Sequence, residues 1–457
     1  MKKILITIIL TFCANSFLLS YEHSRLYYNH KEFFFDSDLS FSIPQIYSQN
    51  YKHKVLINYS YISSLIDYSQ YFYDSNNILL SYSYSNRINQ NLIMDFSMFI
   101  ENSKQRPRDK NFIYWNDSHF GLSSDVEKGF LSYVDNLFFL KIGRDFFQPG
   151  YYSYNRILFS SKGKPFDQLV FGFKKNNISI SSFYLSLSPH PIPIFSESLI
   201  DTSRHMNGHR LNFKFKDGYF AINELIIYGG VSKRIDFALL NPLLPYYIYH
   251  KNHRNFPSNS ILSFEYYYRN KTIGIFAEFV LDDFQIDKED PADLEPNEYG
   301  LLLEIDKNIG DKLLLTFSYL MISNRTFNAP TFAHEKYIHK NLPIGHFLGN
   351  NFWNINFCTY IDFNNLKLGS QFSHLVVGDE ALYSEFNEDF LDYTIEQGYN
   401  EDFPFGDSRV MTGIIFDLDY NVINDFFVSS SISYWFQSVY DNLGTNYQFS
   451  LRYEFYK

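Results

Sequence analysis

Hydrophobic and polar residues alternate at every second position along most of the chain. In Leu92–Ile100, for example, every residue at an even-numbered position is apolar. Alternate side chains of a β-strand point to opposite faces, so a period of two predicts strands with one apolar face. The pattern recurs in segments 55–61, 80–85, 92–100, 137–143, 169–174, 178–187, 211–216, 261–269, 273–281, 299–305, 313–321, 353–360, 366–374, 412–420, 428–436 and 446–457.

The length and the polar face of these segments indicate a membrane barrel. Most run for about 8 to 11 residues, enough to cross a bilayer when tilted, whereas soluble β-sandwiches use about five or six. Their polar faces carry Ser, Asn, Asp, Lys and Arg, which suit a watery interior better than a dry core. A soluble β-protein and a transmembrane antiparallel β-barrel are the two alternatives, and these features favour the barrel.

Connections of two sorts join the predicted strands. Phe173–Ser179 and Ile361–Lys367 place Asn-Asn between two strands, which is a tight-turn signal. The long connections are Glu101–Ser118, Pro189–Gly208, Asn241–Ser260, Asp287–Glu298, Ser323–Asn351 and Val377–Arg409. Short turns at one end and long extracellular loops at the other are typical of outer-membrane barrels. The length of the chain predicts about 16 to 18 strands, at roughly 25 residues for a strand with its connection.

Both ends of the sequence fit an exported barrel. Residues 1–20 predict a secretory signal peptide, with basic Lys2 and Lys3 before an apolar stretch, and residues 21–457 then form one barrel domain. An uncleaved anchor helix is the alternative for the first segment. In Asn446–Lys457, alternating aromatic residues resemble the assembly signal of bacterial outer-membrane proteins. In a barrel the last strand pairs with the first, and lipid covers its apolar face.

Charge and cysteine content exclude several classes of function. The formal net charge of −11 disfavours nucleic-acid binding. Beyond the predicted signal only Cys358 remains, so neither an intrachain disulfide nor a cysteine zinc site is expected. His205 and His209 are spaced like a metal pair on a helix, but Gly208 and the strand that follows favour a structural role. No cofactor or metal is expected, and no G-x-S-x-G, H-E-x-x-H or P-loop motif indicates an enzyme.

The connection Val377–Arg409 is strongly acidic. Its ten carboxylates are not interrupted by Lys or Arg until the closing Arg409. A solvated loop is the favoured interpretation, and a negative patch that binds divalent cations or a basic ligand is the alternative. A short amphipathic helix is also predicted here, because four apolar residues follow a helical spacing. These residues are Leu382, Phe386, Phe390 and Tyr393.

An ordered set of motifs gives a more specific indication of function. The motifs are GRDFFQPGYYSYNRILFSS (Gly143–Ser161), RHMNGHRLNF (Arg204–Phe213), NELIIYGG (Asn223–Gly230), NPLLPYY (Asn241–Tyr247) and AEFVLDDFQID (Ala277–Asp287). In this order and spacing they resemble the Wzi-like capsule-assembly family of outer-membrane proteins. The resemblance covers about residues 137 to 305. Phe147 and Gln148 depart from it, since the family has Trp-Gly at this point.

The resemblance implies a monomeric barrel of about 18 strands that holds capsular polysaccharide on the cell surface. The charged residues of the motifs are expected to form a salt-bridge network in the lumen, because isolated charges near a membrane are costly. They are Arg144, Asp145, Arg210, Glu224, Asp282 and Asp283. Sugar contacts are expected from aromatic and amide side chains of the loops. The candidates are Tyr114, Trp115, Tyr246, Tyr247, Tyr249 and Asn252.

The function predicted from these observations is a non-enzymatic protein of the bacterial outer membrane that retains or organises capsular or other extracellular polysaccharide. A passive porin or selective uptake channel is the alternative, and an enzyme with its site at the barrel rim is third. The expected partners are outer-membrane lipids and lipopolysaccharide, capsular polysaccharide and the barrel-assembly machinery. No nucleic-acid partner is expected, and the chain is expected to be a monomer.

Overall fold

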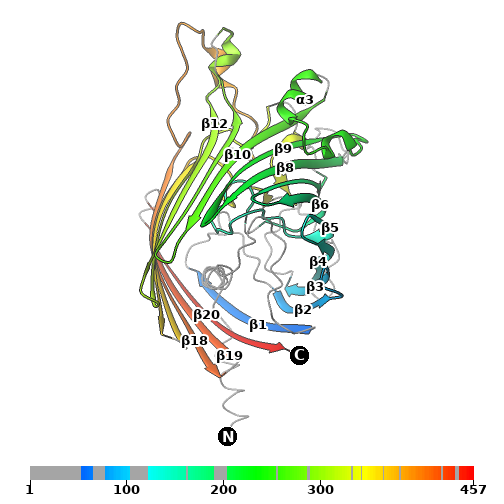
Figure 1. Ribbon diagram of the computed structural model, residues 1–457. Helices are drawn as coiled ribbons and strands as arrows, with labels where there is room; N and C mark the ends of the chain where they lie inside the picture. Colours follow the sequence, from blue (N-terminus) through cyan, green and yellow to red (C-terminus); the bar gives the residue numbers. More distant parts are fainter. Residues whose placement is uncertain are drawn as a thin grey trace.

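The chain forms a single antiparallel sheet that curves round into a barrel (Figure 1). The computed structural model describes residues 53–64, 78–102, 122–160, 163–189, 203–253, 256–285, 289–330, 333–340, 342–363, 365–379, 382–423, 426–437 and 442–456. The predicted signal peptide lies outside these residues. Within them, no helix is both long and apolar enough to cross a membrane.

Eighteen strands build the barrel wall. They are β1 (His53–Ser64), β2 (Ile78–Arg87), β3 (Leu92–Asn102), β4 (Leu122–Val134), β5 (Phe138–Asp145), β6 (Phe166–Lys175), β7 (Ile178–Leu187), β8 (Ser203–Phe215), β9 (Gly218–Gly230), β10 (Ser258–Arg269), β11 (Ile273–Asp283), β12 (Glu298–Ile309), β13 (Leu313–Ile322), β16 (Phe352–Phe363), β17 (Leu366–Val377), β18 (Arg409–Ile423), β19 (Phe426–Gln437) and β20 (Asn442–Tyr456). The described residues also include a hairpin of two short strands with two residues each, an α-helix and four 3-10 helices. These are β14 (Ile338–His339) with β15 (Leu342–Pro343), α3 (Tyr246–Asn252), η2 (Phe237–Leu240), η3 (Pro291–Leu294), η4 (Ala333–Glu335) and η5 (Asp389–Asp392).

Each strand of the wall pairs with its neighbours in chain order, and the last strand pairs with the first. The β20–β1 ladder runs from Tyr456 opposite Lys54 to Asn446 opposite Ser64. The β1–β2 ladder is shorter and covers His53 to Ile57. The antiparallel barrel predicted from the alternating pattern is confirmed, and the strand number is at the upper end of the predicted range.

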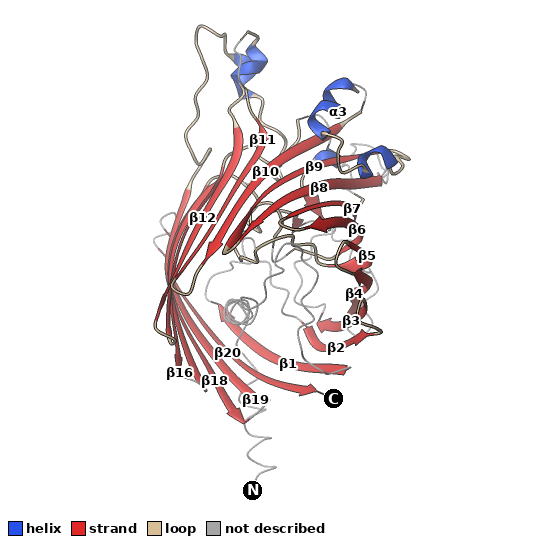
Figure 2. Cartoon of the chain, viewed as in Figure 1, coloured by secondary structure: helices blue, strands red, loops and turns tan. Residues whose placement is uncertain are grey.

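The connections alternate between short turns and long loops, as predicted. At one end of the barrel, two to four residues join consecutive strands, as at Asn176–Asn177 between β6 and β7. At the other end most loops are longer, although four residues join β19 to β20, and several loops rise well above the wall (Figure 2). Some predicted loop boundaries were wrong, because β8 already begins at Ser203, within the predicted loop Pro189–Gly208. The long-loop end corresponds to the extracellular side of a barrel in an outer membrane.

The two faces of the wall differ as the alternation requires. Large apolar side chains that point away from the lumen remain exposed around the barrel, which fits lipid contact. They include Met94, Met98, Leu131, Ile142, Phe173, Phe213, Phe220, Tyr266, Phe279, Leu301, Ile305, Phe317, Phe357, Phe372, Ile414, Phe416 and Leu418. The opposite face carries buried Ser, Asn, Gln, Glu and Arg side chains together with apolar ones.

Candidate functional site

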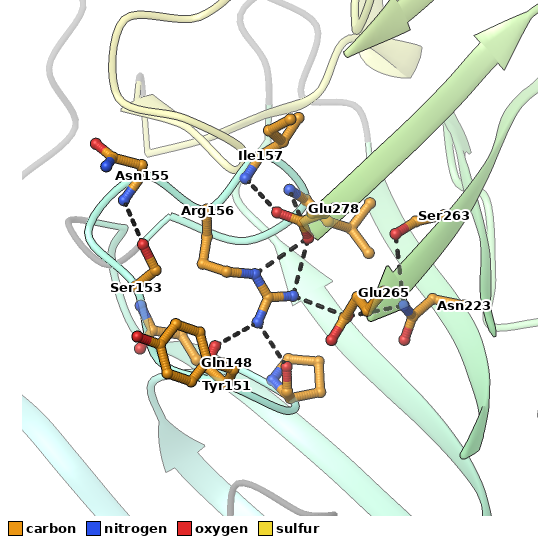
Figure 3. A network of polar contacts seen from close by, with 12 residues as sticks. Gln148, Tyr151, Ser153, Asn155, Arg156, Ile157, Asn223, Ser263, Glu265 and Glu278 are labelled. Carbon is orange, nitrogen blue, oxygen red and sulfur yellow. Dashed lines mark hydrogen bonds and ion pairs between the residues drawn. The ribbon is translucent and has the colours of Figure 1, made fainter. Parts of the chain in front are cut away.

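A first segment folds into the lumen between β5 and β6. This segment, residues 146–160, is called the first plug segment. Its central residue is Arg156, whose side chain is 1% exposed and makes two ion pairs with the barrel wall. The guanidinium lies 2.8 Å from Oε1 of Glu265 on β10 and 2.9 Å from Oε1 of Glu278 on β11. Figure 3 shows Arg156 between these two carboxylates.

The remaining donors and acceptors around Arg156 are also satisfied. Its Nη1 donates to the carbonyl oxygens of Pro149 and Tyr151, at 2.9 and 2.7 Å, which closes a turn of the segment around the guanidinium. Glu278 accepts a further hydrogen bond from the Ile157 amide at 2.7 Å. Buried charges are tolerated when they are paired and fully hydrogen-bonded, so this arrangement fixes the segment to the wall.

Glu265 links Arg156 to a second buried arginine, Arg210 of β8. Arg210 donates to both carboxylate oxygens of Glu265, at 2.6 and 3.0 Å, in the bidentate geometry that suits a guanidinium. Asn223 of β9 donates to the same carboxylate at 2.9 Å. Gly150 packs against this group with φ at +84°, and an added Cβ would lie 2.7 Å from Arg210 Nη2 and Glu265 Oε2. The position therefore requires glycine for both conformation and space.

A third carboxylate, Glu304 of β12, holds the same segment at its other side. Its Oε2 accepts from the Ser153 hydroxyl at 2.9 Å and from the Asn155 amide at 3.3 Å. Its Oε1 accepts from the Tyr151 hydroxyl at 3.2 Å. The first plug segment therefore binds β10, β11 and β12 through three separate acidic side chains.

The second plug segment, residues 323–351, comes from the loop between β13 and β16. Arg204 of β8 is buried beneath it and donates to the backbone carbonyls of His334 at 2.7 Å, Ile338 at 2.8 Å and Lys336. The two anchors are reciprocal. In the first segment a loop arginine binds wall carboxylates, and here a wall arginine binds loop carbonyls.

The two plug segments pack directly against each other. The Tyr337 hydroxyl donates to the Leu158 carbonyl at 2.7 Å, and the Ser160 amide donates to the Ile344 carbonyl at 2.7 Å. Apolar side chains of both segments join the inward side chains of the wall in one buried cluster. Within it, Phe147 lies 4.5 Å from Phe183 of β7 between ring centroids. Two chain segments thus fill part of the lumen with hydrogen-bonded, close-packed protein.

A third loop, residues 378–408, covers the second plug segment at the rim. Glu401 of this loop accepts from Arg325 at 2.7 Å, and Lys336 donates to the carbonyls of Leu382 and Ser384. The predicted amphipathic helix in this acidic loop was wrong, because its one helical element is the four-residue η5. Of the four apolar residues at helical spacing, Leu382 and Phe390 are nevertheless buried.

Burial shifts the pKa of titratable groups in the second plug segment. Burial raises the pKa of Glu335 to about 7 and lowers that of His334 to about 4. Burial, with help from nearby Lys340, lowers the pKa of His339 to about 3. His339 accepts from the Ser188 amide through Nδ1 at 2.9 Å, and its Nε2 lies 3.2 Å from the Pro165 carbonyl. A neutral ring protonated at Nε2 satisfies both contacts.

These shifts predict that acid loosens the second plug segment. Between pH 6.5 and 5, His334 and His339 are neutral while the segment is docked and take up a proton each when it leaves the wall. Glu335 is protonated while the segment is docked and gives up its proton when the segment leaves. The net uptake of one proton favours release by up to about tenfold per pH unit. We expect deuterium uptake in peptides from 333–346, corrected for intrinsic exchange rates, to rise accordingly. His339→Gln should flatten this dependence and Glu335→Gln should steepen it, and an equal slope in all three proteins would contradict the assignment.

The charged residues predicted to share the lumen occupy different places. Arg210 lies in the Glu265 cluster, and Asp282 faces the lumen, where it accepts from the Phe327 amide. Asp145 forms a separate buried pair with Lys141 at 2.5 Å. The other three do not lie in the lumen interior. Arg144 binds Asp167, which is exposed, Asp283 is exposed at the end of β11, and Glu224 lies on the outer face of β9.

The predicted sugar-binding residues also lie in different environments. Tyr114 and Trp115 lie outside the described residues. Tyr246 is fully buried, so its prediction as a contact residue was wrong. The other three belong to α3, where Tyr247 and Asn252 are exposed and the Tyr249 hydroxyl donates to Asp236. Among the described residues, no group of three or more His, Cys, Asp or Glu side chains is placed to hold a metal ion.

Sequence reasoning missed the residues that hold the plug. Arg156 stands within the motif Gly143–Ser161, but its role was not recognised. Glu265 and Glu278 each stand at a position where the alternation of their strand predicts an inward side chain. Acidic residues at lumen-facing positions of two neighbouring strands require a cation from elsewhere, and this was the available signal.

Comparison with known proteins supports the fold. No family model matches the chain, and no curated protein matches it. Among solved structures it is similar to Wzi of Escherichia coli, an outer-membrane protein involved in group 1 capsule assembly and described as a carbohydrate-binding β-barrel. The two are 11% identical, with a TM-score of 0.54 over 88% of this chain and 84% of Wzi.

Two porin structures are also matched at lower TM-scores. OprD of Pseudomonas aeruginosa is 8% identical, with a TM-score of 0.47 over 92% of this chain and 98% of OprD. OccAB4 of Acinetobacter baumannii is 10% identical, with a TM-score of 0.46 over 88% of this chain and 97% of OccAB4. With its apolar outer surface, its alternating turns and loops and its likeness to Wzi, the chain has the fold of the bacterial outer-membrane β-barrels.

Proposed function

We propose that this outer-membrane barrel is a non-enzymatic, Wzi-like protein that retains extracellular polysaccharide at the cell surface. The observation that carries the proposal is the pair of plug segments held in the lumen, the first by buried ion pairs and the second by a buried arginine that donates to its backbone carbonyls. A conduit for solutes does not need such anchors, whereas a rigid platform for a surface polymer benefits from them. The structural similarity to Wzi, which is described as a carbohydrate-binding barrel, supports the same proposed function.

The rim offers side chains suited to sugar contact. In the loop 378–408, Tyr383 and Tyr393 are exposed, and aromatic faces of this kind pack against sugar rings. Tyr393 lies 5.2 Å from Tyr399 between ring centroids, so it is held by a neighbour rather than extended freely. Within the proposal, these two exposed tyrosines join Tyr247 and Asn252 as candidate contacts for the polymer.

Deleting the gene in an encapsulated host should test the proposal. We expect cell-attached polysaccharide to fall while the released polymer rises, because synthesis continues and retention is lost. Expression of the unaltered protein should restore attachment, and a Tyr383→Ala/Tyr393→Ala variant should restore it only in part. An unchanged ratio of attached to released polymer would contradict the proposal.

Single-channel recording separates retention from the porin alternative. The purified protein in planar bilayers should show no stable open pore, because the plug segments are anchored to the wall. A steady, large conductance in the unaltered protein, together with normal polymer attachment in the deletion strain, would favour an uptake channel instead.

A further inference from the structure

The loop between β9 and β10 folds back over the outside of the barrel. This segment, described at residues 231–253 and Phe256, contains η2 and α3 and is called the outer-wall flap. Leu239 and Tyr246 of the flap form a buried cluster with Ile226 and Tyr228 of β9. All four side chains are completely buried. Figure 1 shows α3 beside the ends of β9 and β10 at the long-loop side.

The alternation of β9 establishes which face the flap covers. Leu225 and Ile227 belong to the large cluster that includes both plug segments, so they point into the lumen. Ile226 and Tyr228 alternate with them and point to the opposite face. The flap therefore packs on the lipid-facing side of the wall, near its extracellular edge.

Polar contacts hold the flap in this position. Glu224 accepts from the Tyr247 amide and lies 2.9 Å from Nε2 of His209 on β8. The Tyr228 hydroxyl accepts from the Asp236 amide at 3.1 Å and donates to Asn207 at 2.9 Å. These bonds explain why Glu224 faces outward without being exposed to lipid as an unpaired charge.

The outer surface of the flap is unusually apolar for a loop. Phe237 and Leu243 are each 77% exposed, and Val231, Tyr247 and Ile248 are more than half exposed. The same side of the wall carries the exposed lipid-facing side chains of β8, β9 and β10, including Phe213, Phe220 and Tyr266. The apolar flap surface thus continues the lipid-facing belt toward the extracellular edge, where a membrane interface lies.

The flap is basic although the chain is acidic. Residues 231–253 contain Lys233, Arg234 and Lys251 but only one acid, Asp236. Asp236 is engaged within the flap by the Tyr249 hydroxyl at 2.9 Å and the Ala238 amide at 3.0 Å. Arg234 and Lys251 are exposed, and Lys233 is half-buried with its ammonium 4.1 Å from the centroid of the Phe256 ring. Cations beside exposed apolar groups match a lipid that carries both phosphate and acyl chains.

We propose that the outer-wall flap binds a phosphate-bearing glycolipid of the outer leaflet. Phe237, Leu243 and Ile248 contact its acyl chains, and Lys233, Arg234 and Lys251 pair with its phosphates. The flap thereby fixes the height of the barrel in the membrane and keeps the rim loops clear of the lipid. None of these six residues is a candidate polysaccharide contact, although Tyr247 and Asn252 belong to the same helix α3.

Site-directed labelling tests the apolar half of the site. The full chain is reconstituted with an environment-sensitive fluorophore on Phe237→Cys or Leu243→Cys, and on Leu391→Cys in η5 as a matched exposed control. Cys358 is buried, and the unaltered protein carrying it measures the background labelling. Labels at 237 and 243 should be quenched by spin-labelled acyl chains, and the label at 391 by aqueous iodide. Iodide quenching at 237 and 243 equal to that at 391 would overturn the proposal.

Lipid titration tests the charged half. The protein in neutral detergent is titrated with bisphosphorylated lipid A and with the same lipid lacking both phosphates, and bound lipid is counted by native mass spectrometry. Lys233→Gln, Arg234→Gln and Lys251→Gln should each weaken binding of the phosphorylated lipid about fivefold. Lys271→Gln, in the short turn at the opposite end, should not. Equal binding of the two lipids, or equal affinity in all variants, would overturn the proposal, whatever the polysaccharide assay shows.

Discussion

An Arg156→Met variant is expected to release the first plug segment and to convert a non-conducting barrel into a conducting one. The change removes the cation between Glu265 and Glu278 and leaves two buried carboxylates with fewer partners. Removing one partner of a buried ion pair typically costs about 3 to 5 kcal/mol. Bringing water to these carboxylates relieves that cost, so the segment should leave the wall. Planar-bilayer recording should show openings that the unaltered protein lacks.

Arg144→Met provides the matched control for this result. Arg144 makes the same kind of ion pair, with Asp167 at 2.8 Å, but Asp167 is 60% exposed, and the second partner of Arg144, Asp125, lies farther away at 3.4 Å. An exposed pair contributes about 1 kcal/mol or less, and Asp125 keeps Lys340 as a cationic neighbour at 3.9 Å, so this variant should remain non-conducting. Openings of similar size and frequency in both variants would show that Arg156 does not hold the plug.

The second large effect is expected from Arg204→Met. Loss of the guanidinium leaves the carbonyls of His334, Lys336 and Ile338 without their buried donor. A buried polar group that loses its partner costs about 1 to 3 kcal/mol, so the total for three carbonyls is on the order of 3 to 9 kcal/mol. Deuterium uptake should rise strongly in peptides covering 333–346, whereas peptides from β10 and β11 should stay protected.

Arg204→Lys distinguishes the charge from the shape of the side chain. Lysine keeps the positive charge, but its ammonium group does not reproduce the planar fork that reaches three carbonyls. Protection of 333–346 should therefore be intermediate between that of the unaltered protein and Arg204→Met. Full protection in Arg204→Met would indicate that packing alone holds the second plug segment.

The alternating pattern predicted the barrel because lipid on one side and a polar lumen on the other impose a period of two. It missed β4 and β9, where another constraint breaks that period. In β4, Glu127 is an extra residue between Lys128, opposite Ser97, and Val126, opposite Met98, so the apolar positions shift by one. In β9, the run Leu225–Tyr228 is apolar throughout, because the plug covers one face and the flap the other.

The candidate site was harder to predict than the fold. The motifs located charged residues, but their partners depend on where loops fold, and a local sequence carries little information about that. Glu224 illustrates the difficulty, since its motif suggested the lumen whereas the flap makes a polar site on the outer face. Arg156 could not be assigned for the same reason, because its acidic partners lie on strands far away in the sequence.

The anchoring of the first plug segment also dictates an order of events during assembly. Glu265 and Glu278 follow Arg156 by 109 and 122 residues, and Tyr337 follows Leu158 by 179. Docking therefore requires β10, β11 and the second plug segment to be in place, and contacts between residues this far apart form slowly. Until then the barrel is a hydrated tube whose interior carboxylates face water. Sealing thus follows the pairing of β10 with β11, and an intermediate stalled before that step would leak.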